Sequence, residues 1–430
     1  MPGGTLAGQP RADLILRGFS EIATLEGPSP RRGPAMENLS RVERGALASD
    51  HGRITWVGPE RSLPRAVTRR PRCRELSFEG CVALPGLVDA HTHAIFAGSR
   101  ADELRPKVQG MSYAEIARGG GGLFQTVRET RKASRGRLLA ESAARLARMR
   151  DWGTTTVEVK SGYALETAGE LRLLELLPLL ARRVRMNLVP TFLGAHAFPP
   201  GVRGGHEAYL RTLTERMIPE VARRRLARFC DVFCDPGFFS RAQARRVLRA
   251  GLAHGLAPKI HADELANLGG SRLAAELPAV SADHLLRSDA RDREALARSG
   301  VIGVVLPTTP FASLLPTRSP GRELVDAGVA VALGSDLSPN SWVESYPQVI
   351  SHAVYSARLT PAEALSAATV NAAAALRLGE SAGQLAPGRP LDLAVFPLAR
   401  VEEIPYRFGT SPPVAVFRAG ERVDGNGRFS

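Results

Sequence analysis

The feature that most constrains the fold of this chain is a regular alternation of short apolar runs with longer amphipathic segments. The amphipathic segments, such as 171–182 and 241–254, carry apolar residues at helical spacing. Strands that alternate with helices pair in parallel, and a (β/α)8 barrel requires eight of them. We therefore predict an α/β fold of the (β/α)8 TIM type. Its strands are expected at 81–88, 154–159, 184–192, 229–234, 257–260, 280–282, 301–306 and 329–333.

Both ends of the chain carry a different pattern, in which apolar and polar residues alternate with a period of two. This pattern indicates half-buried strands, and Asp50-His51-Gly52 suits a hairpin turn between two of them. Because neither end can bury a core alone, we expect both to pair in one small β-sandwich domain. The predicted division assigns 1–81 and 381–430 to this domain and 82–380 to the barrel. Residues 31–38 are expected to form a loose loop.

The formal net charge is +14, but only four of the 57 basic residues are lysines. The arginines are scattered over predicted helix faces without an aromatic-interleaved basic stripe, which disfavours nucleic-acid binding and favours an acidic small-molecule substrate. The four cysteines lack zinc-ribbon or disulfide-framework spacing. Neither a leader-like N-terminus nor an apolar run of ~18 to 20 residues is present. We expect a cytoplasmic chain without a membrane partner, and a homodimer stays open as its assembly.

Histidines and an aspartate follow several of the predicted strands. His91 and His93, spaced i, i+2, point to one side of a strand end. His261, His284 and Asp336 each end a later apolar run, and the C-terminal strand ends of such a barrel form its active face. Three imidazoles and a carboxylate with one open position are typical of a catalytic zinc or iron site. For His284 two roles stay open, metal ligand or a group just outside the ligands that polarises substrate, and we favour the second.

Other residues near these strand ends suggest further roles. Glu264, three residues beyond His261, can shuttle a proton to a leaving nitrogen, although a loop salt bridge is the alternative. Arg100 can hold a substrate carboxylate. The glycines at 119–122 are followed by no Lys-Ser/Thr, so a substrate-covering loop is favoured over a phosphate-binding one. Lys160 raises the alternative of a carboxylated lysine between two metals, but the residues above suffice for one metal.

From 52 to 392 the chain resembles the imidazolonepropionases, within the metal-dependent amidohydrolase superfamily. The resemblance implies that His91, His93, His261 and Asp336 bind one divalent or trivalent ion, zinc or iron. It also implies that Arg100, Tyr163, His196 and Glu264 contact the substrate, 4-imidazolone-5-propanoate. The segments that carry it are Asp89-Ala90-His91-Thr92-His93, Phe96-Ala97-Gly98-Ser99-Arg100, Glu158-Val159-Lys160-Ser161-Gly162-Tyr163, Phe192-Leu193-Gly194-Ala195-His196, His261-Ala262-Asp263-Glu264 and Ser281-Ala282-Asp283-His284.

One segment departs from that family. After the strand-eight aspartate the family usually reads Asn-Pro-Gly-Ser/Thr, whereas this chain has Ser338-Pro339-Asn340-Ser341. We expect Ser338, Asn340 and Ser341 to contact substrate or product, although Asn340 replaces a glycine that permits close backbone approach.

The function we expect is imidazolonepropionase activity, a metal-hydroxide hydrolysis of the cyclic amide that yields N-formimidoyl-L-glutamate. In it Glu264 moves the proton, His284 steadies the oxyanion and Arg100 anchors the propanoate. The enzyme alternative is a cyclic-amidine deaminase of the same superfamily, of the cytosine or guanine type, which needs no carboxylate-binding arginine. A metal-free binding scaffold is disfavoured because every expected ligand is present.

Overall fold

Eight parallel strands form a barrel in the computed structural model, which describes residues 9–425. Each strand pairs in parallel with its neighbour in sequence. The barrel closes between its first and last strands, where Ala90 N donates to Leu333 O and Asp336 N donates to His91 O. The predicted (β/α)8 barrel is confirmed. Its strands are β6 (Leu87–Asp89), β7 (Thr154–Lys160), β8 (Asn187–Ala195), β9 (Phe229–Cys234), β10 (Ala257–Ala262), β11 (Ser281–His284), β12 (Ile302–Val305) and β13 (Val331–Leu333).

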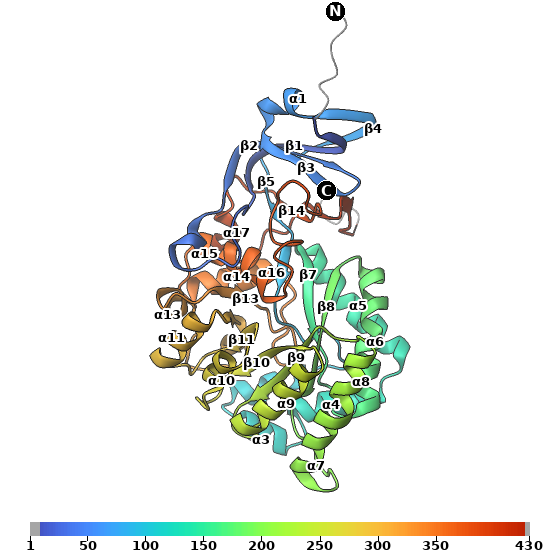
Figure 1. Cartoon of the computed structure of the whole chain (residues 1–430), viewed down its shortest axis with the longest axis vertical. Helices are drawn as coiled ribbons and strands as arrows, with labels where there is room; N and C mark the ends of the chain where they lie inside the picture. Colours follow the sequence, from blue (N-terminus) through green and yellow to red (C-terminus); the bar gives the residue numbers. More distant parts are fainter. Residues whose placement is uncertain (1–8, 426–430) are drawn as a thin grey trace, which may run out of the picture.

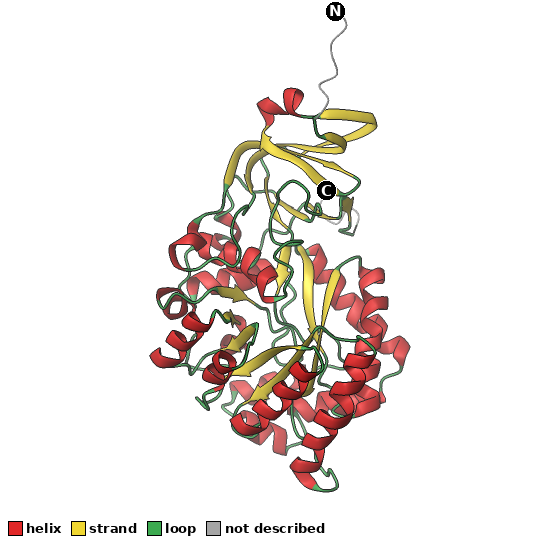
Figure 2. Ribbon diagram, in the orientation of Figure 1, coloured by secondary structure: helices red, strands yellow, loops and turns green. Residues whose placement is uncertain are grey.

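Helices surround these strands, as Figure 2 shows in red around yellow. Each longer helix buries one apolar stripe against the sheet: α6, for instance, buries leucines along its length and exposes arginines at its C-terminal end. The main crossover helices are α5 (Arg135–Asp151), α6 (Thr167–Val184), α7 (Gly205–Thr212), α8 (Ile218–Arg223), α9 (Arg241–Ala253), α10 (Gly270–Glu276), α11 (Ala290–Ser299), α12 (Thr308–Ala312), α13 (Gly321–Asp326), α14 (Tyr346–Tyr355), α15 (Pro361–Ala367) and α16 (Val370–Ala375).

Between β6 and β7 the chain makes a long excursion before α5. It contains the short helices α2 (Leu104–Val108) and α3 (Tyr113–Arg118), followed by α4 (Gly122–Lys132). The glycine-rich stretch expected to cover substrate joins α3 to α4, and Gly122 N donates to Glu103 Oε1 at 2.6 Å. This excursion supplies several groups at the mouth of the barrel.

The two ends of the chain meet in a second unit, which lies above the barrel in Figure 1. Its core contains Leu14 and Leu47 from the N-terminal part and Leu393 and Phe417 from the C-terminal part. The predicted β domain built from both ends is confirmed, and its strands are hydrogen-bonded into one mixed sheet. They are β1 (Arg11–Ala23), β2 (Arg41–Asp50), β3 (Arg53–Pro59), β4 (Thr68–Ser77), β5 (Val82–Pro85), β14 (Leu393–Phe396), β15 (Ala415–Arg418) and β16 (Glu421–Arg422).

The prediction of one barrel strand at 81–88 is wrong, because this run divides at Gly86. β5 pairs with β1 and β14 in the β domain, whereas β6 pairs with β7 in the barrel. A single apolar run therefore crosses from one sheet to the other. We keep 1–81, 82–380 and 381–430 as the proposed domain division, although β5, at the start of the second part, pairs within the β domain.

The loop expected at 31–38 is also more ordered than predicted. Residues Gly33–Glu37 form a 3-10 helix, and Met36 is buried. Arg31 is buried as well, and its guanidinium donates to the carbonyl oxygens of Leu25 and Glu26. Asn371 of α16 bonds the backbone of Arg31 on both sides. Contacts with residues distant in sequence therefore order segment 31–38, although its local sequence does not predict a regular structure.

Two observations bear on the setting of the chain. Within residues 9–425, no helix combines the length and apolar character needed to cross a membrane. All four cysteines are free thiols, and Cys230 and Cys234 are buried. The first eight residues, on which the expected absence of a leader partly depends, lie outside the described residues.

Gly86 gives a test of the strand division. A Cβ at this position would lie 2.8 Å from Thr155 Cβ, inside van der Waals contact, so Gly86→Ala must push β7 away from the crossing. We expect this substitution to lower the free energy of unfolding in urea by about 1–3 kcal/mol. Gly136→Ala is the control, because a Cβ there meets only Ser134 Oγ, 4.0 Å away. Equal stability of the two variants would contradict the tight crossing.

Candidate active site

A cavity of about 420 Å³ opens at the C-terminal ends of the barrel strands. His91 is fully buried beside it. Ser341 does not line it: this residue lies behind Ser338, and their backbone and hydroxyl groups bond each other. The lining includes ten of the residues predicted from the sequence, namely His93, Arg100, Tyr163, His196, His261, Glu264, His284, Asp336, Ser338 and Asn340.

Four side chains converge at the floor of this cavity. His93 Nε2 lies 3.3 Å from His91 Nε2 and 3.4 Å from His261 Nε2. Asp336 Oδ1 lies 3.6 Å from His93 Nε2 and 3.8 Å from His91 Nε2. Ligand atoms placed tetrahedrally at ~2.0–2.1 Å from an ion are ~3.3–3.4 Å apart. The four residues therefore lie close enough together to bind one divalent ion.

Burial keeps the imidazoles of His91 and His93 neutral. It lowers the pKa of His91 and His93 well below the usual value, and neighbouring positive groups lower it further. Burial also raises the pKa of Asp336 to about 6, against the effect of a hydrogen bond from Thr309 Oγ1. The neutral imidazole is the form of histidine that binds a metal ion.

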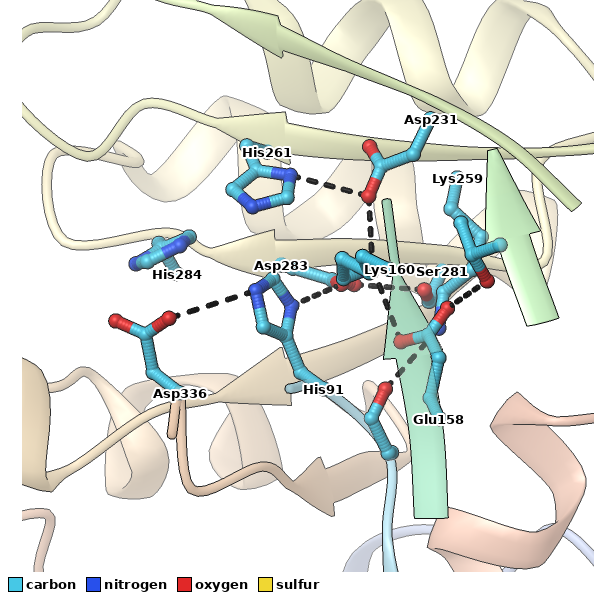
Figure 3. A network of polar contacts seen from close by, with 12 residues as sticks. His91, Glu158, Lys160, Asp231, Lys259, His261, Ser281, Asp283, His284 and Asp336 are labelled. Atoms are coloured by element: carbon cyan, nitrogen blue, oxygen red, sulfur yellow. Dashed lines mark hydrogen bonds and ion pairs between the residues drawn. The ribbon is translucent and has the colours of Figure 1, made fainter. Parts of the chain in front are cut away.

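Two buried carboxylates hold the rings from behind. His91 Nδ1 lies 2.6 Å from Asp283 Oδ2, and His261 Nδ1 lies 3.1 Å from Asp231 Oδ2 (Figure 3). A carboxylate on Nδ1 fixes the ring orientation and leaves Nε2 as the atom that faces a metal. Asp231 and Asp283 were not identified as site residues from the sequence, although Asp231 lies on the otherwise apolar strand β9.

Lys160 lies beneath these two carboxylates and contacts both of them as well as Glu158. Its Nζ is 2.7 Å from Asp231 Oδ2, 3.0 Å from Glu158 Oε2 and 3.4 Å from Asp283 Oδ2. Burial opposes its positive charge, but the three carboxylates outweigh burial and raise the pKa of Lys160. A protonated amine has no lone pair for carboxylation. This geometry argues against the two-metal alternative.

Lys259 extends the same network toward the bottom of the barrel. Its Nζ lies 2.9 Å from Glu158 Oε2 and donates to Ala90 O, beside β6. Figure 3 shows the two lysines beside their carboxylates, with Lys259 and Glu158 to the right of His91 and His261. We call Glu158, Lys160, Asp231, Lys259 and Asp283 the buried ion network. In formal charge it holds one more carboxylate than ammonium group, so it favours a cation above it.

Glu264 and His284 face each other across the cavity wall. Glu264 Oε2 lies 3.6 Å from His284 Nδ1. Burial, and then the charge of Asp336, raise the pKa of Glu264 well above its usual value. Among the described residues, neither ring nitrogen of His284 has a hydrogen-bond partner. Both groups are therefore available to a molecule in the cavity.

The loop that carries Glu264 is fixed by its backbone. Asp235, just after β9, accepts hydrogen bonds from the amides of Glu264, Leu265 and Ala266. The backbones of His284 and Asp336 adopt left-handed conformations, with φ of +73° and +53°. Non-glycine residues in this region are costly and often mark functional sites, so the strain supports assigning function to this end of the barrel.

Aromatic rings form the middle of the cavity. The ring of His196 stacks on that of His93 with centroids 5.0 Å apart, and Tyr163 lies 5.3 Å from His196. Phe233 and Phe238 complete this wall, and the sequence analysis did not identify them. Phe233 had a detectable signal, because it follows Asp231 by two residues on β9 and so faces the same side.

A cation was also missed at the outer rim. Lys107 of α2 lines the cavity, and its Nζ donates to Asn340 Oδ1 at 2.7 Å. Arg100 is at the same rim, with Glu103 along one edge of its guanidinium at 2.9 and 2.7 Å. Lys107 gave no sequence signal because it follows none of the predicted strands and belongs to none of the motifs.

Comparisons with known proteins agree with this geometry. The model of the amidohydrolase family matches residues 234–423. An imidazolonepropionase of Symbiobacterium thermophilum is 43% identical over 97% of this chain and 98% of its own length. Another, from Geobacillus thermodenitrificans, is 43% identical over 96% of this chain and 99% of its own. The chain belongs to the imidazolonepropionase family.

Solved structures show the same fold at lower identity. An atrazine chlorohydrolase from Arthrobacter aurescens, complexed with zinc, has a TM-score of 0.72 and 17% identity, covering 96% of this chain and 95% of its own. An adenosine deaminase from Xanthomonas campestris with bound zinc has a TM-score of 0.70 and 18% identity, covering 96% and 93%. Membership of the imidazolonepropionase family, with the His/Asp cluster, implies a divalent metal site.

The buried ion network gives a test through stability. Lys160→Met leaves three carboxylates without their shared cation in a site closed to water. We expect this variant to lose about 3–5 kcal/mol of unfolding free energy, measured by urea denaturation. Lys132→Met, at an exposed position on α4, is the matched control and should be close to the parent protein. Similar losses in both variants would show that Lys160 is not an ionic centre of the fold.

Proposed function

We propose that this protein hydrolyses the cyclic amide bond of 4-imidazolone-5-propanoate and releases N-formimidoyl-L-glutamate. The observation that carries the proposal is one cavity that combines four converging ligand atoms, a buried carboxyl group and a cationic rim. Such a cavity fits a small ring with an acidic tail. Membership of the imidazolonepropionase family supports the same substrate, and as a member the chain is a hydrolase of C–N bonds.

His91, His93, His261 and Asp336 are the proposed ligands of one zinc or iron ion. Bound there, such an ion lowers the pKa of water toward ~7 and makes hydroxide available at neutral pH. Asp283 and Asp231 hold two of the imidazoles by Nδ1 at 2.6 and 3.1 Å, so that Nε2 stays directed to the cavity.

Glu264 is the proposed proton carrier of the reaction. It takes the proton of the attacking water and delivers it to the ring nitrogen that leaves, so that the amide C–N bond breaks without an unprotonated amine anion. Its backbone, held by Asp235, keeps the carboxyl group facing the cavity. His284, whose ring nitrogens have no partner among the described residues, stabilises the developing oxyanion by a hydrogen bond.

The remaining predicted residues hold the substrate. Tyr163 and His196 pack against the imidazolone ring, and Arg100 attracts the propanoate from the rim. Ser338 and Asn340 supply polar contacts on the side of β13. Ser341 acts through Ser338, because it lies behind this residue rather than at the cavity surface.

The proposed setting of the enzyme is the cytoplasm, where the four free thiols stay reduced. Its proposed partner is the small carboxylate-bearing substrate alone, and a homodimer is the assembly that we propose for it. Analytical ultracentrifugation distinguishes this dimer from a monomer.

The decisive experiment is a steady-state assay of the metal-loaded protein. We expect loss of imidazolonepropanoate and formation of formimidoylglutamate without release of ammonia. Cytosine and guanine serve as the comparison substrates, with ammonia as the readout. Ammonia from either base, together with inert imidazolonepropanoate, would replace the proposed function by a cyclic-amidine deaminase.

Glu264 and His261 give a matched pair of variants. Glu264→Gln removes a proton carrier but no ligand, so we expect the metal to be retained and kcat to fall by about 10² to 10⁴. His261→Ala removes a ligand and should lose both metal and turnover while the barrel stays folded. Metal content is measured by atomic absorption, and the fold by circular dichroism. Near-normal turnover in Glu264→Gln would exclude its proposed role.

A further inference from the structure

The outer rim of the cavity carries two basic side chains, Arg100 and Lys107. They differ in how far the protein already balances their positive charge. Glu103 accepts hydrogen bonds from Nε and Nη2 of Arg100, at 2.9 and 2.7 Å, and both side chains are buried. Glu103 Oε1 is also held by Gly122 N. Glu103 therefore largely balances the charge of Arg100 and occupies one edge of its guanidinium group. An anion at this rim gains less from Arg100 than from a cation without an acidic partner.

Lys107 is such a cation. Within residues 9–425, no carboxylate oxygen forms an ion pair with its Nζ within 4 Å. The side chain is half-buried in the cavity wall, where burial and the charge of Arg100 lower its pKa, against the effect of Glu103. Among the described residues, its Nζ donates one hydrogen bond, of 2.7 Å, to a neutral group, Asn340 Oδ1. An incoming anion would therefore relieve an uncompensated charge at this point.

Asn340 determines where this charge is held. Its Oδ1 accepts from Lys107 and, at 3.4 Å, from Arg100 Nη2, while its Nδ2 donates to Ser313 Oγ at 3.1 Å. One amide oxygen thus contacts two cationic donors, as an oxygen of a bound carboxylate would. Asn340 stands where the family resemblance leads one to expect glycine, which has no side chain to make these contacts.

We propose that Lys107 determines specificity for a carboxylate-bearing substrate, and that Asn340 holds its ammonium group at the carboxylate position until substrate binds. The inference rests on the proposed function, because it assigns a residue to the tail of that substrate. On binding, the carboxylate takes the place of Asn340 Oδ1 as the partner of Lys107. Arg100 then contributes as a second positive charge at the same rim.

The test compares two ligands on the metal-loaded full chain by isothermal titration calorimetry. Imidazolepropanoate has the ring and the acidic tail but no hydrolysable amide, and methylimidazole has the ring alone. In Lys107→Met we expect affinity for imidazolepropanoate to fall about 10- to 100-fold, the effect of losing one charge-assisted hydrogen bond, with methylimidazole unaffected. Lys107→Arg keeps the charge and should recover part of the affinity. Lys132→Met, on exposed α4, is the control and should match the parent protein.

Kinetics separate this inference from the proposed function. With imidazolonepropanoate we expect Lys107→Met to raise KM by a similar factor and leave kcat unchanged. Unchanged KM in an active enzyme, or equal loss of affinity for both ligands, would overturn the role of Lys107 and leave the proposed function intact. A parent protein that fails to hydrolyse imidazolonepropanoate would overturn the function itself, whatever the binding data.

Discussion

The structure depends above all on a set of charges placed where water cannot reach them. In the buried ion network, one ammonium group is shared by carboxylates from β7, β9 and β11, and a second one ties β7 to β10. Removing Lys160 would leave Asp231 and Asp283 without a lysine partner in a medium of low dielectric constant, which is costlier than keeping the network intact. The same contacts that join four strands also aim two imidazoles. Stability and ligand geometry are therefore coupled in this barrel.

Closure of the barrel also requires two backbone segments to approach each other closely beside the proposed metal ligands. A Cβ at Gly334 would lie 2.6 Å from His91 Cβ, so only glycine allows the end of β13 to lie against the segment after β6 that carries His91. Asp336 follows two residues later, and its left-handed backbone turns the carboxylate toward the imidazoles. The residues that close the barrel, around His91 and Asp336, are thus also the residues that form the floor of the cavity.

The sequence predicts the features that follow from the periodicity of apolar residues and from the position of a residue along a strand. It found the strands, the helices and the polar groups at strand ends, because alternation and apolar runs report these directly. It failed where partners lie far apart in sequence: no local pattern reveals that Lys160 meets Asp231 and Asp283, or that the apolar run around Gly86 serves two sheets. Charged residues two apart on apolar strands, such as Glu158 and Lys160, were a usable signal of an inward polar layer. Lys107 gave no such signal in the sequence, since its role depends on the folded residues around it.

The pairing of the two chain ends in one sheet has a consequence for synthesis. β1 to β5 leave the ribosome first, yet the edge of β5 that receives β14 stays bare until the whole barrel has been translated. An unpaired edge is a template for association with other chains. The β domain can therefore be completed only after β14 to β16 have been synthesised. A chain that stops early would display that edge permanently, which makes it a natural target for chaperones and proteases.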